Sequence, residues 1–92
     1  MRVIIRESAY DDLERIHAWI EKERPRSADS VIDRVLEGVE QLERFPYIGR
    51  TGRAPGTYEL VVRGLPFIVV YQVSADDPVV IVIGVFHCAQ DR

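Results

Sequence analysis

The chain has 92 residues, a net charge of −3, a single cysteine and a hydrophobic content of 47%. This length suffices for one domain and not for two, the hydrophobic content excludes a disordered chain, and a lone cysteine excludes an internal disulfide. From the length we expect a single domain over residues 1–92, and the lone cysteine fits the reducing cytoplasm. The longest apolar stretch, Val79 to Phe86, is too short to cross a bilayer, so no location in the membrane is expected.

The first half of the chain predicts one strand followed by two helices. The opening segment alternates and is rich in Val and Ile, which is typical of a strand. Ser8 and Asp11 have the spacing of a capping box, and an apolar stripe then follows at helical spacing: Ala9, Leu13, Ile16 and Ile20. Pro25 ends this helix, and we expect Ser27 to cap a second one, whose stripe is Ala28, Ile32, Val35, Val39 and Leu42. The short connection favours an antiparallel helix hairpin.

The second half predicts a loop and then three strands. Residues 46–57 contain three glycines and two prolines, which indicates little regular structure. Strands are expected over residues 57–63, 67–73 and 79–87, and short turns between them favour an antiparallel meander. The order β-α-α-β-β-β predicts a two-layer α+β fold, in which the helix hairpin packs on one face of a mainly antiparallel sheet that includes the opening strand. Gly84 inside the last strand indicates a bulge or a close packing contact.

The predicted sheet is apolar on both faces, although two helices can cover only one. A sheet with helices on one face and water on the other alternates apolar and polar residues, and the last two strands do not. An apolar face without a cover is typical of a binding surface. We expect five residues to contact a partner there: Ile68, Val70, Val80, Val82 and Phe86. The alternatives are a sheet that curls over this face, or self-association.

Charge is unevenly distributed along the chain. Residues 7–43 carry eleven acids and five bases, whereas residues 44–73 carry four arginines and one glutamate. Arginine favours bidentate contacts to carboxylate or phosphate, so we expect a target or a phosphate to contact Arg50, Arg53, Arg63 and the strand-end His87. The alternatives are arginines that are solvated or pair with the acidic helices, and a histidine bonded to backbone. The two histidines and the cysteine lack metal-ligand spacing, so no metal or cofactor is expected.

An ordered series of short segments resembles the ParE/RelE toxin superfamily: Phe45-Pro46-Tyr47-Ile48-Gly49-Arg50, Pro55-Gly56-Thr57-Tyr58-Glu59-Leu60-Val61-Val62, Phe67-Ile68-Val69-Val70-Tyr71 and Val85-Phe86-His87. The likeness is greatest to the ParE-like branch, often called plasmid stabilisation proteins. It implies the toxin of a type II toxin–antitoxin system, held silent in a hetero-oligomer by a cognate antitoxin that is ParD-like or of another kind. The apolar face would then be the antitoxin-binding surface.

The resemblance implies one of two activities. ParE-type toxins inhibit DNA gyrase by binding, whereas RelE-type toxins cleave mRNA in the ribosomal A site with basic residues and a late Tyr or His. The RelE pattern has an arginine three residues before its strand tyrosine, and here Ile68 stands three residues before Tyr71. Loss of that arginine removes electrostatic stabilisation of the reacting phosphate, so we expect a gyrase inhibitor without catalysis. The alternatives are a ribosome-dependent mRNA endonuclease, with His87 and Arg63 as its catalytic residues, and an inactive interaction module.

Overall fold

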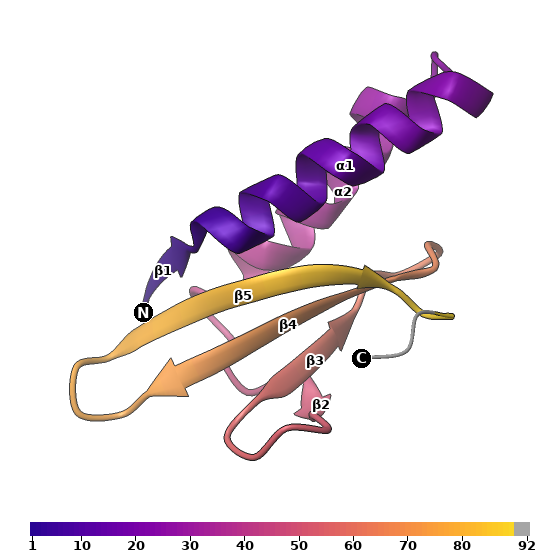
Figure 1. Cartoon of the computed structure of the whole chain (residues 1–92). Coiled ribbons are helices and arrows are strands. Elements are labelled where there is room, and N and C mark those ends of the chain that lie inside the picture. The colour runs from indigo at the N-terminus through magenta and orange to yellow at the C-terminus, as the bar shows by residue number, and fades with distance from the viewer. Residues whose placement is uncertain (90–92) are drawn as a thin grey trace.

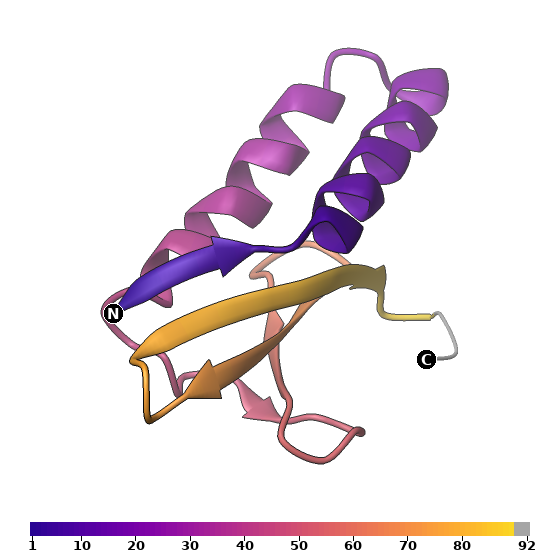
Figure 2. The same cartoon turned by 60° about the vertical axis from the view of Figure 1, so that its left-hand side comes forward.

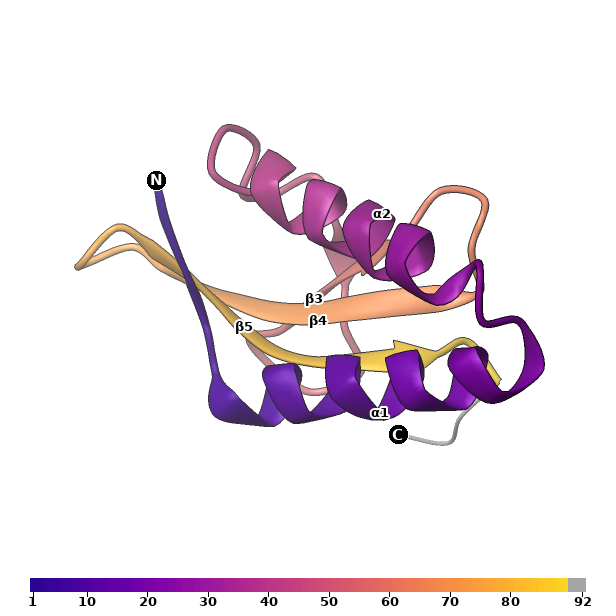
Figure 3. The same cartoon turned by 90° about the horizontal axis from the view of Figure 1, so that it is seen from above.

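Two helices pack on one face of a five-stranded sheet in the computed structural model, which describes residues 1–89 (Figure 1). The elements are β1 (Arg2–Ile5), α1 (Glu7–Glu23), α2 (Ala28–Gln41), β2 (Arg50–Thr51), β3 (Tyr58–Val61), β4 (Phe67–Ser74) and β5 (Val79–His87). The strand order is β1-β5-β4-β3-β2, with β1 parallel to β5 and every other pair antiparallel. The two helices run antiparallel (Figure 2) and lie side by side over the sheet (Figure 3). The predicted two-layer α+β fold is confirmed.

Local details of the helix ends and of one strand differ from the prediction. β2 lies within residues 46–57, where a loop was expected, because two residues are too few to show the alternation of a strand. It pairs Arg50 with Glu59 of β3. The predicted capping box at Ser8 is wrong, since α1 begins after Arg6; Ser27 is the N-cap residue of α2 as predicted, but its side chain makes no cap bond. Ser8 instead donates its hydroxyl to the carbonyl oxygen of Ile83 at 2.6 Å, which ties the start of α1 to β5.

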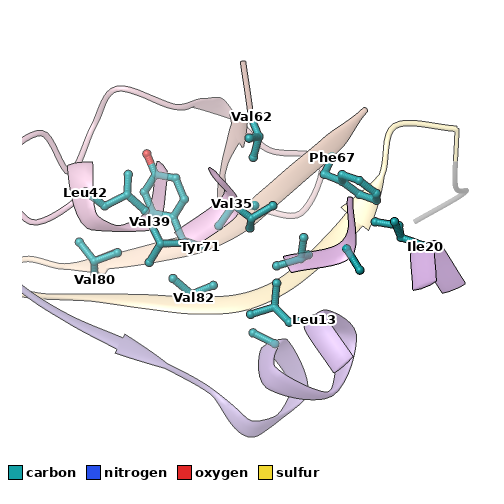
Figure 4. Close-up of a cluster of buried hydrophobic side chains, with 14 residues drawn as sticks. Leu13, Ile20, Val35, Val39, Leu42, Val62, Phe67, Tyr71, Val80 and Val82 are labelled. Atoms are coloured by element: carbon teal, nitrogen blue, oxygen red, sulfur yellow. The ribbon is translucent and has the colours of Figure 1, made fainter. Parts of the chain in front are cut away.

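The core lies between the helix pair and the sheet (Figure 4). Both predicted helix stripes face it, and β4 and β5 contribute the other side. Its largest fully buried side chains are Tyr71, Leu42, Val35, Val69, Val80 and Val82. Burial of each such aliphatic side chain stabilises the fold by about 1.5–3 kcal/mol relative to leaving it in water. The helix hairpin is therefore held by packing on the sheet and not by capping.

A bulge in β5 breaks the alternation of that strand. Val70 of β4 pairs with Gly84, but the next residue, Tyr71, pairs with Val82, so Ile83 is the extra residue. One extra residue reverses the faces of everything that follows it in the strand. The bulge that Gly84 indicated is confirmed.

The bulge redistributes apolar residues between the two faces of the sheet. Val85 joins Val80 and Val82 in the core beneath the helices. Phe86 lies on the opposite face, across from Ile68 of β4. Strict alternation had placed Phe86 with Val80 and Val82, and this assignment is wrong because it assumed an unbroken register.

Asp12 of α1 takes the place of a missing strand neighbour at the bulge. β1 pairs only with Val79–Val82, so the far half of β5 has no strand on that side. There the Asp12 carboxylate, which is buried, accepts the backbone N–H of Val85 at 2.9 Å and forms an ion pair with Arg15. Gly84 leaves room for this contact, because a Cβ on it would lie 2.9 Å from the Asp12 carboxylate.

We expect Asp12→Ala to destabilise the protein by about 1–3 kcal/mol, because it leaves a buried backbone N–H without an acceptor. Urea unfolding followed by circular dichroism measures the change. Asp11→Ala is the matched control, since Asp11 is the neighbouring acid on the same helix and is exposed. Equal stability of the two variants would contradict the role of Asp12.

Candidate interaction site

The face of the sheet away from the helices, here the open face, is apolar but partly sheltered. Ile68 is only 2% exposed, yet it lies outside the core cluster beneath the helices. Val70, Ile81, Ile83 and Phe86 are half-buried on this face. The sheet therefore curls enough to shelter part of the open face, and it leaves the remainder to water or to a partner.

A groove of about 570 Å³ runs over the open face, beside the loop that follows β2. The apolar side chains of Val70, Ile83 and Phe86 line it, and Arg53 and Glu59 lie at its polar end. Apolar walls with a few polar groups are typical of a site that takes up another molecule. The open face is therefore the candidate interaction site.

Three of the five residues expected to contact a partner lie on the open face, and two do not. Ile68, Val70 and Phe86 are on it. Val80 and Val82 are 0% and 1% exposed and belong to the core beneath the helices. The expectation for these two is corrected, because both face the helices and are buried in the core. The bulge puts Phe86 on the other face of the sheet from them.

Glu59 is a buried carboxylate that organises the polar end of the groove. It is 5% exposed, and Arg50 approaches its Oε1 at 3.3 Å while the backbone N–H of Arg53 donates to its Oε2 at 3.4 Å. A buried charge needs such partners, because it has lost its contact with water. The Arg50 guanidinium thus already has a carboxylate beside it within the chain.

The structure does not gather the predicted contact residues at one centre. Arg63 lies in the turn between β3 and β4, where its carbonyl accepts a hydrogen bond from α2. The His87 ring meets Phe67 edge-on at 5.6 Å, and its Nδ1 accepts the backbone N–H of Ala89 at 3.0 Å. Arg53, Arg63 and His87 line three different pockets.

Three tyrosines connect the loop after α2 to the core. Tyr71 is fully buried, and its hydroxyl accepts the backbone N–H of Gly49 at 3.0 Å. Burial raises the pKa of Tyr71; the bond from Gly49 acts in the opposite direction, and Tyr58 raises it further. Tyr58 stacks on Tyr71 with ring centroids 5.5 Å apart, and Tyr47 meets Tyr58 edge-on at 5.6 Å. The loop is thereby fixed in place.

We expect Gly49→Ala to destabilise the protein by about 1–3 kcal/mol through overpacking. A Cβ at this position would lie 2.6 Å from the Tyr71 hydroxyl and 2.8 Å from the Glu59 carbonyl oxygen. Thermal unfolding measures the effect. Gly38→Ala in α2 is the control: its Cβ meets Leu60 at 3.6 Å, and alanine favours a helix over glycine by up to about 1 kcal/mol. A tolerated Gly49→Ala would contradict the close contact.

Residues 1–89 hold no cluster of three or more His, Cys, Asp or Glu residues suited to a metal ion. No helix in this part of the chain has the length and apolar character needed to cross a membrane.

Comparison with known proteins gives concordant matches. Residues 3–92 match the family model described as the ParE toxin of the type II toxin–antitoxin system parDE. The chain is 38% identical over 78 residues to the Sinorhizobium fredii protein named "Putative toxin Y4kP", covering 85% of this chain and 78% of that protein. Two similar solved structures are the chromosomal ParDE system of P. aeruginosa (TM-score 0.85, 20% identity, 95% of each chain) and the E. coli RelBE toxin–antitoxin complex (TM-score 0.72, 19% identity, 99% of this chain and 98% of that one). At these identities the two structures show a shared fold.

Proposed function

The chain belongs to the ParE toxin family, within the ParE/RelE superfamily of type II toxin–antitoxin toxins, and from this we propose that it inhibits DNA gyrase by binding and without catalysis. The proposal treats residues 1–92 as one domain, which acts in the cytoplasm and is silenced by a cognate antitoxin in a hetero-oligomer. One observation carries the choice of gyrase: Ile68, where the RelE pattern has an arginine, is apolar and 2% exposed.

The surroundings of Ile68 support a binding mode without catalysis. It pairs with Phe86 across β4 and β5, so an apolar surface occupies the place of the phosphate-binding cation. Cleavage of RNA needs a base, an acid and cations around one phosphate. Arg63 and His87 line different pockets, and the His87 ring is held by Phe67 and by backbone.

One observation favours the alternative, a ribosome-dependent mRNA endonuclease. Phe67 pairs with His87, and its carbonyl accepts the backbone N–H of Val62, the residue before Arg63. Arg63 and His87 therefore lie near the same end of the sheet, where a large RNA could contact both.

We expect the purified protein to block supercoiling by DNA gyrase, and His87→Ala and Arg63→Ala to block it equally well. Toeprinting on translating ribosomes should show no cuts in the A site, because no cation stands at position 68. Supercoiling that is unaffected at micromolar protein would contradict gyrase inhibition. A-site cuts that disappear in both variants would establish the endonuclease instead.

The open face is the surface that we assign to the antitoxin. The two solved structures compared above carry the titles of toxin–antitoxin systems, and this chain shares their fold. Its open face offers half-buried Val70, Ile81, Ile83 and Phe86, next to a groove with an arginine at one end. An extended or helical segment could bury its own apolar side chains in such a groove.

We expect Val70→Glu and Ile81→Glu each to weaken binding of the antitoxin about tenfold or more, because a charge would be buried against apolar side chains. The test co-expresses the tagged toxin with its proposed cognate antitoxin and measures co-purification and growth. Tyr10→Glu, at a 53% exposed position on the helix side, is the control and should bind as the unaltered chain does. If both open-face variants fold normally by circular dichroism and are still neutralised, the antitoxin binds another surface.

A further inference from the structure

A second apolar surface lies outside the open face, at the end of α2. Three of the eight large apolar side chains that are exposed in residues 1–89 fall within four consecutive residues: Phe45 (54%), Tyr47 (56%) and Ile48 (46%). Arg44 lies with its guanidinium carbon 5.8 Å from the centre of the Phe45 ring. We call these four residues the aromatic–arginine patch. It contributes none of the core residues and lines none of the pockets described above.

The aromatic–arginine patch is exposed but held in a fixed position. The backbone N–H of Phe45 donates to Gln41 in α2 at 2.9 Å, and that of Ile48 donates to Phe45 at 3.2 Å. The Tyr47 ring rests edge-on against Tyr58, which stacks on the buried Tyr71. A ring held in the way that the Tyr47 ring is held loses little conformational freedom on binding, which is the property of an interface anchor.

The charge around the patch indicates the chemistry of its partner. Residues 44–58 contain three arginines and no acid, and within residues 1–89 Arg44 makes no ion pair. An arginine beside exposed aromatic rings fits a protein surface that has an apolar pocket with a carboxylate next to it. A long polyanion fits less well, because exposed acids directly precede the patch in the chain: Glu37 and Glu40 of α2, and Glu43 just after it.

We propose that the aromatic–arginine patch binds the toxin's target protein through an apolar pocket flanked by carboxylate, whereas the open face binds the antitoxin. The inference rests on the proposed function in one respect, namely that the toxin acts by binding a protein. Tyr47 and Phe45 are the apolar anchors, and Arg44 supplies the charge that orients the encounter. Target and antitoxin then contact different surfaces of one small domain.

The test measures growth arrest on induction of the toxin alone, and inhibition of purified DNA gyrase, for Tyr47→Ala, Phe45→Ala and Arg44→Glu. Each should weaken both effects about tenfold or more, since alanine in place of an aromatic anchor has this effect at interfaces. Inhibition by the unaltered chain should also weaken as salt is raised. Tyr10→Ala is the matched control, because this tyrosine is equally exposed (53%), lies on α1 outside the patch and should change neither effect. Phe45→Ala guards against misfolding, since Phe45 makes no ring contact to the core tyrosines.

The outcomes separate this inference from the proposed function. An unaltered chain that arrests growth without inhibiting gyrase, while Tyr47→Ala relieves the arrest, would overturn gyrase as target and support the patch. Unaltered potency of Tyr47→Ala and Phe45→Ala, or a loss of antitoxin binding together with potency, would overturn the patch alone. Patch-dependent binding of a labelled single-stranded oligonucleotide, or a dimer that these substitutions dissociate without any loss of toxicity, would also overturn it. A chain that neither arrests growth nor inhibits gyrase would overturn both.

Discussion

The hydrogen bond from the backbone of Val85 to the Asp12 carboxylate is the contact on which the arrangement of both sheet faces depends. It lies just past the extra residue of β5, where no strand is present to accept that N–H. With this side-chain acceptor in place, β5 can keep a bulge in its middle. Val85 then completes the core, and Phe86 becomes part of the opposite face. The buried Asp12 carboxylate thus supports the bulge that places Val85 among the residues that stabilise the fold and Phe86 among those available to a partner.

The sequence was informative wherever a pattern is local. Helical spacing identified both stripes that reach the core, and short turns identified the meander, because these signals depend on neighbouring residues. β2 and the position of the bulge depend on contacts between distant residues, and Gly84 was the sole local sign of the irregularity. The same limit applied to the candidate site: Ile68 and Val70 of β4 lie on the expected face, whereas Val80 and Val82, which precede the bulge in β5, lie on the other face from Phe86, which follows it. Spacing along the chain likewise could not show that Arg63 and His87 line separate pockets.

The proposed activity follows from where charge is and is not concentrated. Phosphoryl chemistry needs several polar groups at one point, and the arginines here are dispersed: Arg50 beside the buried Glu59, Arg63 in a turn, and Arg44 over an exposed ring. Dispersed charge is compatible with recognition of a protein, in which anchors and rim charges are spread over an area. In our proposals the two apolar surfaces have different partners. The aromatic–arginine patch binds the target and the open face binds the antitoxin, and the stack of Tyr47, Tyr58 and Tyr71 connects the patch to the core. This division would let an antitoxin neutralise the toxin without imitating the target.

The side-chain bonds from α1 to β5 also bear on solubility. An unpaired strand edge is a template to which a further chain can add, and repeated addition leads to fibrils. Here Ser8 occupies the carbonyl of Ile83, and Asp12 occupies the N–H of Val85, on the edge that β1 leaves uncovered. The first two turns of α1 therefore protect this edge from intermolecular pairing, and they do so with a negative charge that would repel an incoming backbone carbonyl. A toxin released from its antitoxin would retain this protection, since it is built entirely from its own chain.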